Sequence, residues 1–298
     1  SVSGGQDSMA LMTLLDDIKE QHDWSLHIWH GNHKWHDKSE EFANKLQNYC
    51  LKKKIIFYRD SADKIDISTE EKARQWRYQK LYEKATEICA KNNNYNNLYV
   101  VTGHTSTDNT ETFLLNLARG SNFDGLGGIP SKRLLNKHFF LVRPMLIFTR
   151  NDTASICKKL EIPFWVDPTN SDTTIKRNLI RHKVINELEE IYPGCSKRIN
   201  NFIKKMKNYS KERSELCELA IKSCLCENGI KRRILNNLEE QTRATILHSL
   251  LNTKCGKQIS SKNIEDLSEQ IRQKNQGQKY FAHGVKVIWN KDFIQIIS

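Results

Sequence analysis

The sequence contains no apolar run approaching the roughly 20 residues of a membrane-spanning helix, and no signal peptide is visible. None of its eight cysteines forms a Cys-x-x-Cys pair, and only Cys224 and Cys226 lie close together. Because zinc and iron–sulfur sites favour paired spacings and nearby histidines, the cysteines indicate reduced structural thiols in a reducing compartment.

Two common phosphate-binding motifs are also absent: Gly-x-x-x-x-Gly-Lys-Ser/Thr, and Gly-x-Gly-x-x-Gly after a strand. Instead, Ser3-Gly4-Gly5-Gln6-Asp7-Ser8 runs directly into residues 9–15, an apolar segment that suits a buried helix. A turn through two glycines that opens a helix is a geometry that binds phosphates. Asp7 would repel a phosphate unless a cation lay between them, so we expect Mg²⁺ here. The alternative is an ordinary turn that caps the helix at Asp7 or Ser8.

The chain begins with Ser1 rather than Met, and only Ser1 and Val2 come before this loop. A phosphate loop normally leaves the end of a buried central strand. We therefore expect the sequence to be an N-terminally truncated fragment.

Positive charge is unevenly distributed along the 298 residues, whose length suggests two domains. Residues 191–298 carry 20 Lys and Arg against 10 Asp and Glu, whereas residues 1–190 carry 27 against 25. This difference predicts that the C-terminal part binds a polyanion. The alternative is a solvated Lys-rich surface that reflects biased composition. We predict domains at residues 1–191 and 192–298.

Short segments rich in β-branched or aromatic residues alternate with amphipathic patterns in the first half. We expect strands at 24–30, 54–58 and 98–102, with helices at 39–50 and 69–92. This alternation predicts an α/β domain with a parallel sheet covered on both faces and ligands at the carboxyl ends of its strands. The second domain should be mainly helical, with helices at 201–226, 238–251 and 262–274 and a small β meander at 280–282, 286–289 and 293–297.

Residues 103–112 follow the third predicted strand and place His104, Asp108 and Glu111 where a strand gives way to a helix. Asp108 could simply cap that helix, with Glu111 completing a capping-box-like start. Capping does not account for the glycine-rich segment 124–130 that comes next, which is typical of a mobile or substrate-shaped loop.

Two arginine pairs have helical spacing. Arg74 and Arg77 lie three residues apart beside Tyr78, which alone favours a solvated ion-pair face. Arg177 and Arg181 lie four apart, a spacing that suits phosphate contacts as well as ordinary surface.

Six motifs together resemble those of one enzyme family. They are SGGQDS, AR-x-WRY, GH-x-x-x-D-x-x-ET-x-LL-x-L-x-RGS-x-x-DGL, RPML, W-x-D-P-T-N and RN-x-IR, in this order. The chain is similar to tRNA(Ile)-lysidine synthases of the PP-loop ATP pyrophosphatases over residues 1 to about 198, most of all to the short cyanobacterial and plastid members. The resemblance implies a PP-loop catalytic domain, of the adenine nucleotide alpha hydrolase type, followed by a smaller tRNA-binding domain.

The resemblance also implies a ligation on tRNA(Ile) in two steps, with no membrane and no obligate protein partner. ATP would adenylate C2 of the wobble cytidine in a CAU anticodon and release pyrophosphate. The amine of L-lysine would then attack C2 and expel AMP. The product, lysidine, would change codon recognition from AUG to AUA and tRNA identity from Met to Ile.

The motif positions carry implied roles. Ser3, Gly4, Gly5, Gln6, Asp7 and Ser8 would bind ATP, with Mg²⁺ on Asp7 and a second carboxylate from Asp108. Glu111 would recognise the lysine ammonium or help to deprotonate it. Arg74 would join Asp7, Asp108 and Glu111 in catalysis. Contacts with substrate or tRNA would come from His104, Arg77, Arg119, Arg143, Arg177 and Arg181.

One departure from the family pattern concerns the second motif. Many members have two adjacent acids there, whereas Thr107 and Asn109 flank Asp108 in this chain. Two other functions stay open: another PP-loop tRNA-modifying enzyme, such as a thiolase, and a non-catalytic ATP-sensing RNA-binding protein. A thiolase would need paired cysteines to bind an iron–sulfur cluster. The Lys, Asn and Ile bias favours the chloroplast stroma, with a bacterial cytoplasm as the alternative.

Overall fold

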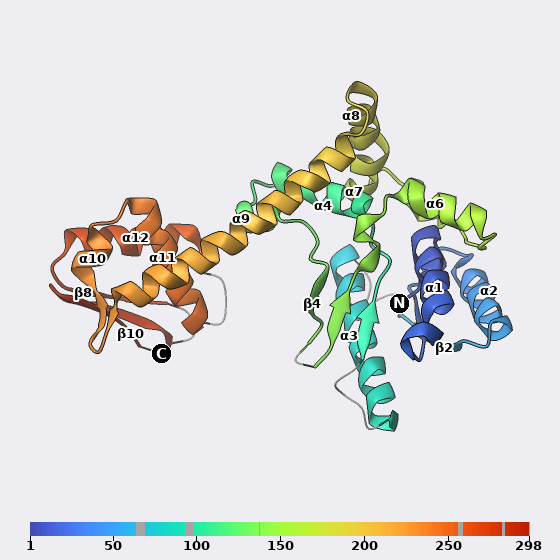
Figure 1. Cartoon of the computed structure of the whole chain (residues 1–298), viewed down its shortest axis with the longest axis horizontal. Coiled ribbons are helices and arrows are strands. Elements are labelled where there is room, and N and C mark those ends of the chain that lie inside the picture. Colours follow the sequence, from blue (N-terminus) through green and yellow to red (C-terminus); the bar gives the residue numbers. More distant parts are fainter. Residues whose placement is uncertain (64–68, 93–97, 137, 256–258, 282–283, 298) are drawn as a thin grey trace. The chain divides into compact units, whose positions relative to one another are not determined.

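The computed structural model describes residues 1–63, 69–92, 98–136, 138–255, 259–281 and 284–297. The chain divides into two compact units, Ser1–Lys207 and Asn208–Ser298 (Figure 1). The division falls within the long helix α9 (Cys195–Cys224), so the boundary that we predict at residue 192 lies inside unit 1. That residues 192–298 form a tRNA-binding domain stays a prediction. None of the described helices is both long and apolar enough to span a membrane.

The sheet of unit 1 is built from two groups of strands. β1 (His27–Asn32) pairs in parallel with β2 (Ile56–Ser61). β5 (Phe140–Val142) pairs in parallel with β3 (Tyr99–Val101) and antiparallel with β4 (Lys132–Leu134). The parallel strands β1, β2 and β3 overlap the predicted ones, whereas β4 and β5 were not predicted.

Ser1 and Val2 connect the two groups of strands. The nitrogen of Ser1 donates to the carbonyl of Val101 at 2.8 Å, and the amide of Val2 donates to that of Trp29 at 2.9 Å. The loop at residues 3–8 therefore leaves from between β1 and β3, in the middle of the sheet.

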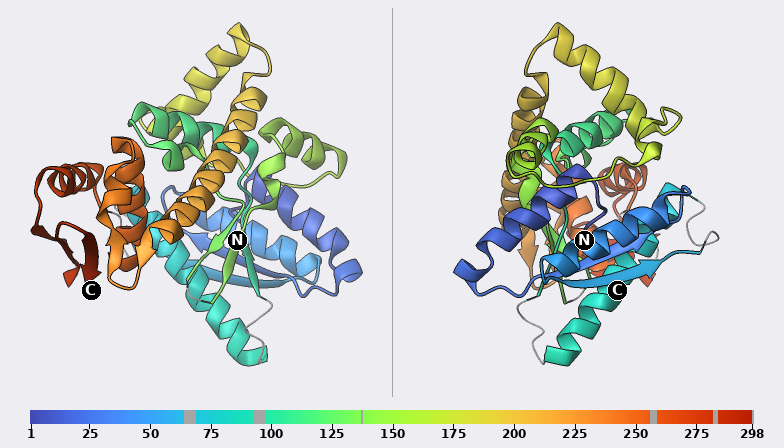
Figure 2. Two further views of the ribbon diagram at one scale, coloured as in Figure 1. Left: turned by 60° about the vertical axis from the view of Figure 1, so that its left-hand side comes forward. Right: turned by 90° about the vertical axis from the view of Figure 1, so that its right-hand side faces the viewer.

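Helices cover both faces of these strands, as the sequence predicts. Ile28 of β1 packs in a core with α1 (Gln6–Ile18), α2 (Ser39–Lys52) and α6 (Arg150–Lys159). Its neighbour Trp29 belongs to a second core with α3 (Glu70–Asn92), because successive side chains of a strand point to opposite faces. Figure 2 shows α2 and α3 on opposite sides of the blue strands.

The remaining elements of unit 1 connect or flank these strands and helices. They are two four-residue helices α5 (Phe123–Leu126) and α7 (Lys176–Leu179), the longer α4 (Ser106–Ala118) and α8 (Ile185–Ile191), the 3₁₀ turns η1 (Glu20–His22), η2 (Pro144–Ile147) and η3 (Pro168–Ser171), and the π-helical turn η4 (Ile180–Val184).

Unit 2 contains more β structure than predicted. Its sheet is antiparallel, in the order β6 (Leu225–Cys226), β7 (Gly229–Lys231), β10 (Phe293–Ile297), β9 (Lys286–Trp289) and β8 (Gly277–Tyr280). The helices α10 (Arg232–Asn236), α11 (Glu240–Cys255) and α12 (Ser261–Gln273) accompany it. The β6–β7 hairpin ends α9 at Cys224, earlier than expected, and the predicted strand end at Ala282 lies outside the described residues.

Two arginines of unit 2 are structural. Arg232 is 5% exposed and donates to the backbone carbonyls of Ile271, Lys274, Asn275 and Asn290. Arg243 is 2% exposed and donates to the hydroxyl of Ser268. Part of the positive charge of the C-terminal region therefore stabilises the fold and cannot contact a polyanion.

Candidate active site

The loop at residues 3–8 closes on itself before helix α1. The amide of Gly5 donates to the hydroxyl of Ser3 at 3.3 Å, and the hydroxyl of Ser8 donates to the carbonyl of Gly5 at 2.9 Å. Because α1 begins at Gln6, Asp7 and Ser8 lie within its first turn. The alternative in which either residue caps the helix is therefore wrong. The free amides of this turn and the positive end of the helix dipole are suited to an anion.

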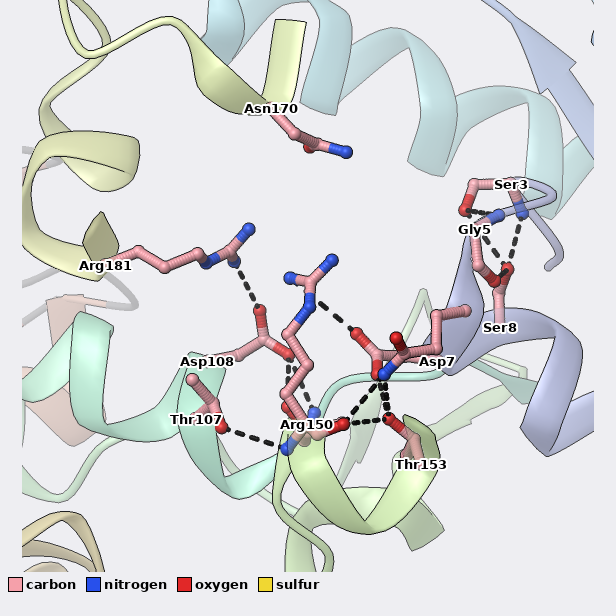
Figure 3. A network of polar contacts seen from close by, with 12 residues as sticks. Ser3, Gly5, Asp7, Ser8, Thr107, Asp108, Arg150, Thr153, Asn170 and Arg181 are labelled. Atoms are coloured by element: carbon pink, nitrogen blue, oxygen red, sulfur yellow. Dashed lines mark hydrogen bonds and ion pairs between the residues drawn. The ribbon is translucent and has the colours of Figure 1, made fainter. Parts of the chain in front are cut away.

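Trp165 supports the loop from behind. Its amide donates to the carbonyl of Gly4 at 3.0 Å. Gly4 has φ +87°, and a Cβ placed there would lie 3.0 Å from the Trp165 ring. Only glycine adopts this positive φ and allows this close approach of the ring without strain. Asn170, from the same W-x-D-P-T-N motif, extends into the space between Arg181 and the loop (Figure 3).

The N-terminus of α6 holds Asp7. The hydroxyl of Thr153 donates to Asp7 Oδ1, and Arg150 Nη1 lies 3.9 Å from Asp7 Oδ2. Burial raises the pKa of Asp7, although the Thr153 hydrogen bond and the Arg150 charge oppose this. A buried carboxylate with so little compensating charge is suited to a cation. Sequence reasoning missed Arg150 and Thr153, although the capping box of Thr149 and Asp152 marks the start of their helix.

Asp108 is the N3 residue of α4, and Thr105 is the N-cap. The expectation that Asp108 itself caps the helix, with Glu111 as partner, is therefore wrong. Asp108 Oδ2 accepts from the amide of Thr105 at 2.7 Å, and Oδ1 accepts from Arg177 at 3.1 Å and Arg181 at 3.4 Å. Burial alone would raise the pKa of Asp108, but the two arginines and this hydrogen bond hold it below its ordinary value.

Glu111 follows one turn later and is completely buried. Arg177 Nε donates to it at 2.7 Å, and Arg181 donates through Nη2 at 3.0 Å and also through Nε. The π-helical turn η4 contains Arg181 and begins directly after α7, which contains Arg177. Both arginines therefore pair with carboxylates, and their predicted contact with phosphate stays a prediction.

The loop and the second motif meet at Asp7 and Asp108. The charge of Asp108 contributes to the raised pKa of Asp7, so the two carboxylates lie within electrostatic range. Figure 3 shows both facing the same space, with the side chain of Arg150 between them. Residues about one hundred positions apart thus converge because parallel strands present their carboxyl ends at one edge.

His104 lies beside this pair and donates to or accepts from the hydroxyl of Thr102 at 2.9 Å. Burial, together with the charges of Arg143 and Arg177, lowers the pKa of His104 to about 4 although Asp108 opposes the shift. The imidazole is therefore neutral at physiological pH.

Two of the predicted residues lie away from the carboxylates. Arg119 is exposed at the C-terminal end of α4, whereas Asp108 is in the first turn of that helix. Arg77 lies near His33, whose pKa is lowered to about 4 by burial and by this charge. Arg74 and Arg143 gather around Tyr78 instead.

Comparison with known proteins agrees with this geometry. A family model described as a PP-loop domain matches residues 1–188. A tRNA(Ile)-lysidine synthase of Prochlorococcus marinus subsp. pastoris is 52% identical over 99% of this chain and 88% of its own length. The chain belongs to the tRNA(Ile)-lysidine synthase family. It is thus an ATP-using ligase, and the predicted family and fold class are confirmed.

More distant relatives extend the comparison. A chloroplastic tRNA(Ile)-lysidine synthase of Pyropia yezoensis is 36% identical over 62% of this chain and 54% of its own length. The U34-tRNA thiolase NcsA from Methanococcus maripaludis, solved with its [4Fe-4S] cluster, superposes with a TM-score of 0.52 at 15% identity, over 69% of each chain. At that identity the thiolase shows only a shared fold.

The two uncharged residues that flank Asp108 in the second motif have structural partners. Thr107 Oγ1 accepts from the amide of Arg150 at 3.1 Å. Asn109 Oδ1 accepts from the amide of Ile129 at 2.7 Å, and its Nδ2 donates to Asn200 at 2.9 Å. A Cβ at Gly128, which has φ +65°, would lie 2.3 Å from Asn109 Oδ1. Asn109 therefore anchors the glycine-rich segment to α9 and is not available for catalysis.

The carboxylates at this site suit a Mg²⁺ ion whose shell is completed by substrate. Within the described ranges, no group of three or more His, Cys, Asp and Glu side chains could hold a metal ion by itself. Mg²⁺ in nucleotide enzymes typically uses one or two carboxylates, and substrate phosphates and water complete its shell. Asp7 and Asp108 supply that number beside the loop at residues 3–8.

Proposed function

We propose that this chain ligates L-lysine to C2 of the wobble cytidine in the CAU anticodon of tRNA(Ile), through an adenylated tRNA. The observation that carries the proposal is the meeting of the phosphate loop with the Asp108–Glu111–arginine network. ATP phosphates and a lysine ammonium need binding groups of opposite sign, and these lie side by side here.

In the adenylation step, the amides of residues 3–8 and the N-terminus of α1 bind the phosphates that leave as pyrophosphate. Asp7 and Asp108 would hold Mg²⁺, which when bound neutralises negative charge on the leaving group. Arg150 lies between the two carboxylates and can bind a phosphoryl oxygen that enters this space.

In the ligation step, the lysine ammonium must lose a proton before its nitrogen can attack. Glu111 is buried and accepts hydrogen bonds from both Arg177 and Arg181. Direct contact between Glu111 and the ammonium therefore requires one arginine to move. Asp108, which shares these arginines, is the second carboxylate within reach, while neutral His104 can exchange hydrogen bonds with the substrate.

We propose the C-terminal region as a tRNA-binding surface because of its excess of positive charge. Removing residues 208–298 leaves the Asn200 contacts with α4 in place. The shortened protein should bind tRNA more weakly, with a smaller dependence of affinity on salt. Unchanged affinity and salt slope would show that the charge reflects composition.

The decisive experiment mixes the full chain, ATP, Mg²⁺, radiolabelled lysine and isoleucine tRNA with a CAU anticodon. Lysine should be transferred to the tRNA with release of AMP and pyrophosphate. Pyrophosphate release without lysine transfer would indicate another PP-loop tRNA-modifying activity. ATP binding with no pyrophosphate release would indicate a non-catalytic ATP sensor.

The relatives and the free cysteines both bear on the compartment in which this protein acts. The relatives come from a cyanobacterium and from a chloroplast. Cysteines 50, 89, 157, 195, 217, 224 and 226 are free, as a reducing compartment requires. We propose the chloroplast stroma, with a bacterial cytoplasm as the alternative, and a protein that uses ATP as a substrate together with Mg²⁺.

A further inference from the structure

Two arginines of unit 1 lie over the ring of Tyr78, and two further cations lie within electrostatic range of them. The guanidinium carbons of Arg74 and Arg133 lie 5.0 and 4.8 Å from the ring centroid. The charge of Arg143 lowers the pKa of Tyr78 and that of Lys207. We call these five residues the Tyr78 cluster. They come from α3, β4, the residue after β5, and α9, so the tertiary fold assembles them.

Among the described residues, no carboxylate forms an ion pair with the cluster. The ion pairs found among the described residues involve other cations, and none includes Arg74, Arg133, Arg143 or Lys207. Arg143 is 2% exposed, and its buried Nε has no hydrogen-bond partner. Buried cations are normally paired, because an uncompensated charge away from water is costly.

The positive charges of the cluster disfavour one another. Burial and the charges of Arg133 and Arg74 lower the pKa of Arg143, and burial and Arg143 lower that of Lys207. Burial would raise the pKa of Tyr78, but Arg74 and hydrogen bonds from Arg133 and Arg143 leave it below its ordinary value. Each shift would be relieved by an anion placed among these groups.

The cluster lies within electrostatic range of the reaction centre. Besides burial, Asp108, Arg143 and Arg74 all influence the pKa of His104. The charges that most influence the pKa of Asp7, in the loop at residues 3–8, are instead those of Arg150, Asp108 and Arg181. The cluster charges thus act on His104 more than on Asp7, which favours a phosphate of the RNA over one of ATP as the bound anion.

We propose that the Tyr78 cluster binds one backbone phosphate of the tRNA beside the reacting cytidine, with Tyr78 as a positioning residue; this rests on the proposed function. Planar guanidinium groups bind phosphate oxygens through two parallel hydrogen bonds. The Tyr78 hydroxyl can donate its proton to a phosphate oxygen held by these guanidinium groups. Holding this phosphate fixes the position of the nucleotide next to it.

The test uses the full-length protein and the tRNA, first unmodified and then with one neutral methylphosphonate linkage at a time around the wobble nucleotide. Binding is measured over a range of salt concentrations without ATP. Arg143→Gln should weaken binding about 10- to 100-fold and reduce the salt slope by about one. Tyr78→Phe should weaken it up to about tenfold with the slope unchanged. Lys80→Gln is the matched control, since it removes one charge from α3 at a side chain paired with Glu83.

We expect the effect of a neutral linkage to depend on the cluster at only one position of the tRNA backbone. A neutral group there should weaken wild-type binding but add little to Arg143→Gln or Arg133→Gln, because both changes remove the same contact. A purely structural role of Arg143 cannot produce that dependence on a single linkage. Arg133→Gln and Tyr78→Phe keep the test decisive if Arg143→Gln fails to fold.

Three results would overturn the proposal. Additive effects at every linkage would assign the cluster a structural role. A loss of ATP affinity with unchanged RNA binding would assign the anion to the nucleotide. Variants whose affinity and slope match Lys80→Gln would show that no phosphate binds there. Failure of the proposed function is a different result, since the unmodified protein would then not transfer lysine at all.

Discussion

Replacing Glu111 by Gln tests how the two halves of the site are held together. Glu111 is completely buried and pairs with Arg177 and Arg181. Glutamine keeps the shape but removes the charge, so two guanidinium groups would share only Asp108. The arginine side chains are 25% and 16% exposed, so water can relieve part of this loss.

Removing one partner of a buried ion pair typically costs about 3–5 kcal/mol. The partial exposure of both arginines and their remaining contact with Asp108 favour the lower end, about 3 kcal/mol. In a unit of about 200 residues this corresponds to a fall of about 6–12 °C in Tm. Tryptophan fluorescence during urea or thermal unfolding reports on unit 1, because only Trp289 of the six tryptophans lies in unit 2.

Glu83→Gln is the matched control. Its side chain is 47% exposed and pairs with Lys80, so its loss should cost under about 1 kcal/mol. If Glu111→Gln unfolds at the same midpoint as Glu83→Gln, the two arginines do not depend on Glu111 and our account of the network is wrong. Lysine transfer is then measured well below the unfolding temperature, so that the loss of stability does not affect it. A catalytic role of Glu111 predicts a raised KM for lysine in the Glu111→Gln variant.

Three further changes test other parts of the site. Because burial raises the pKa of Asp7, its ionised form costs stability at neutral pH; Asp7→Asn should raise the urea midpoint while reducing lysine transfer at least ~100-fold. The pKa of His104 is about 4 instead of 6.5, so the stability that it contributes is lost as pH falls through that window. Between about pH 7 and pH 5, His104→Asn should lose on the order of 1–2 kcal/mol less unfolding free energy than wild type; an equal loss would refute this assignment. Gly4→Ala should weaken ATP binding at least about tenfold, because the added Cβ meets Trp165. Gly120→Ala is the matched control, since Gly120 has a similar positive φ and no atom within 4 Å of the added Cβ; this control should cost only about 1–2 kcal/mol of stability. Equal ATP affinities of the two variants would contradict the role of Trp165.

Local patterns predicted the elements whose cause is local. The two glycines before an apolar run predicted the loop and the start of α1, and alternating segments predicted β1, β2 and β3. The short strands β4 to β7 were missed, because strands of two or three residues depend on pairing with distant neighbours and carry little pattern of their own. The N-cap of α4 was predicted at Asp108, but the structure places it three residues earlier, at Thr105. Both residue types are common at helix starts, so the sequence did not distinguish them.

The sequence by itself determined the family, the phosphate loop and the set of charged residues around it, because these depend on residue types at short, regular spacings. Only the tertiary structure decided which of them meet. Thr153 reaches Asp7 across 146 positions, and Arg177 reaches Glu111 across 66. Helical spacing tells which side chains share a face, but it cannot tell whether that face meets water, a carboxylate or a phosphate. In the tertiary structure Arg177 and Arg181 pair with carboxylates, whereas the cations around Tyr78 form no ion pair within the described part of the chain.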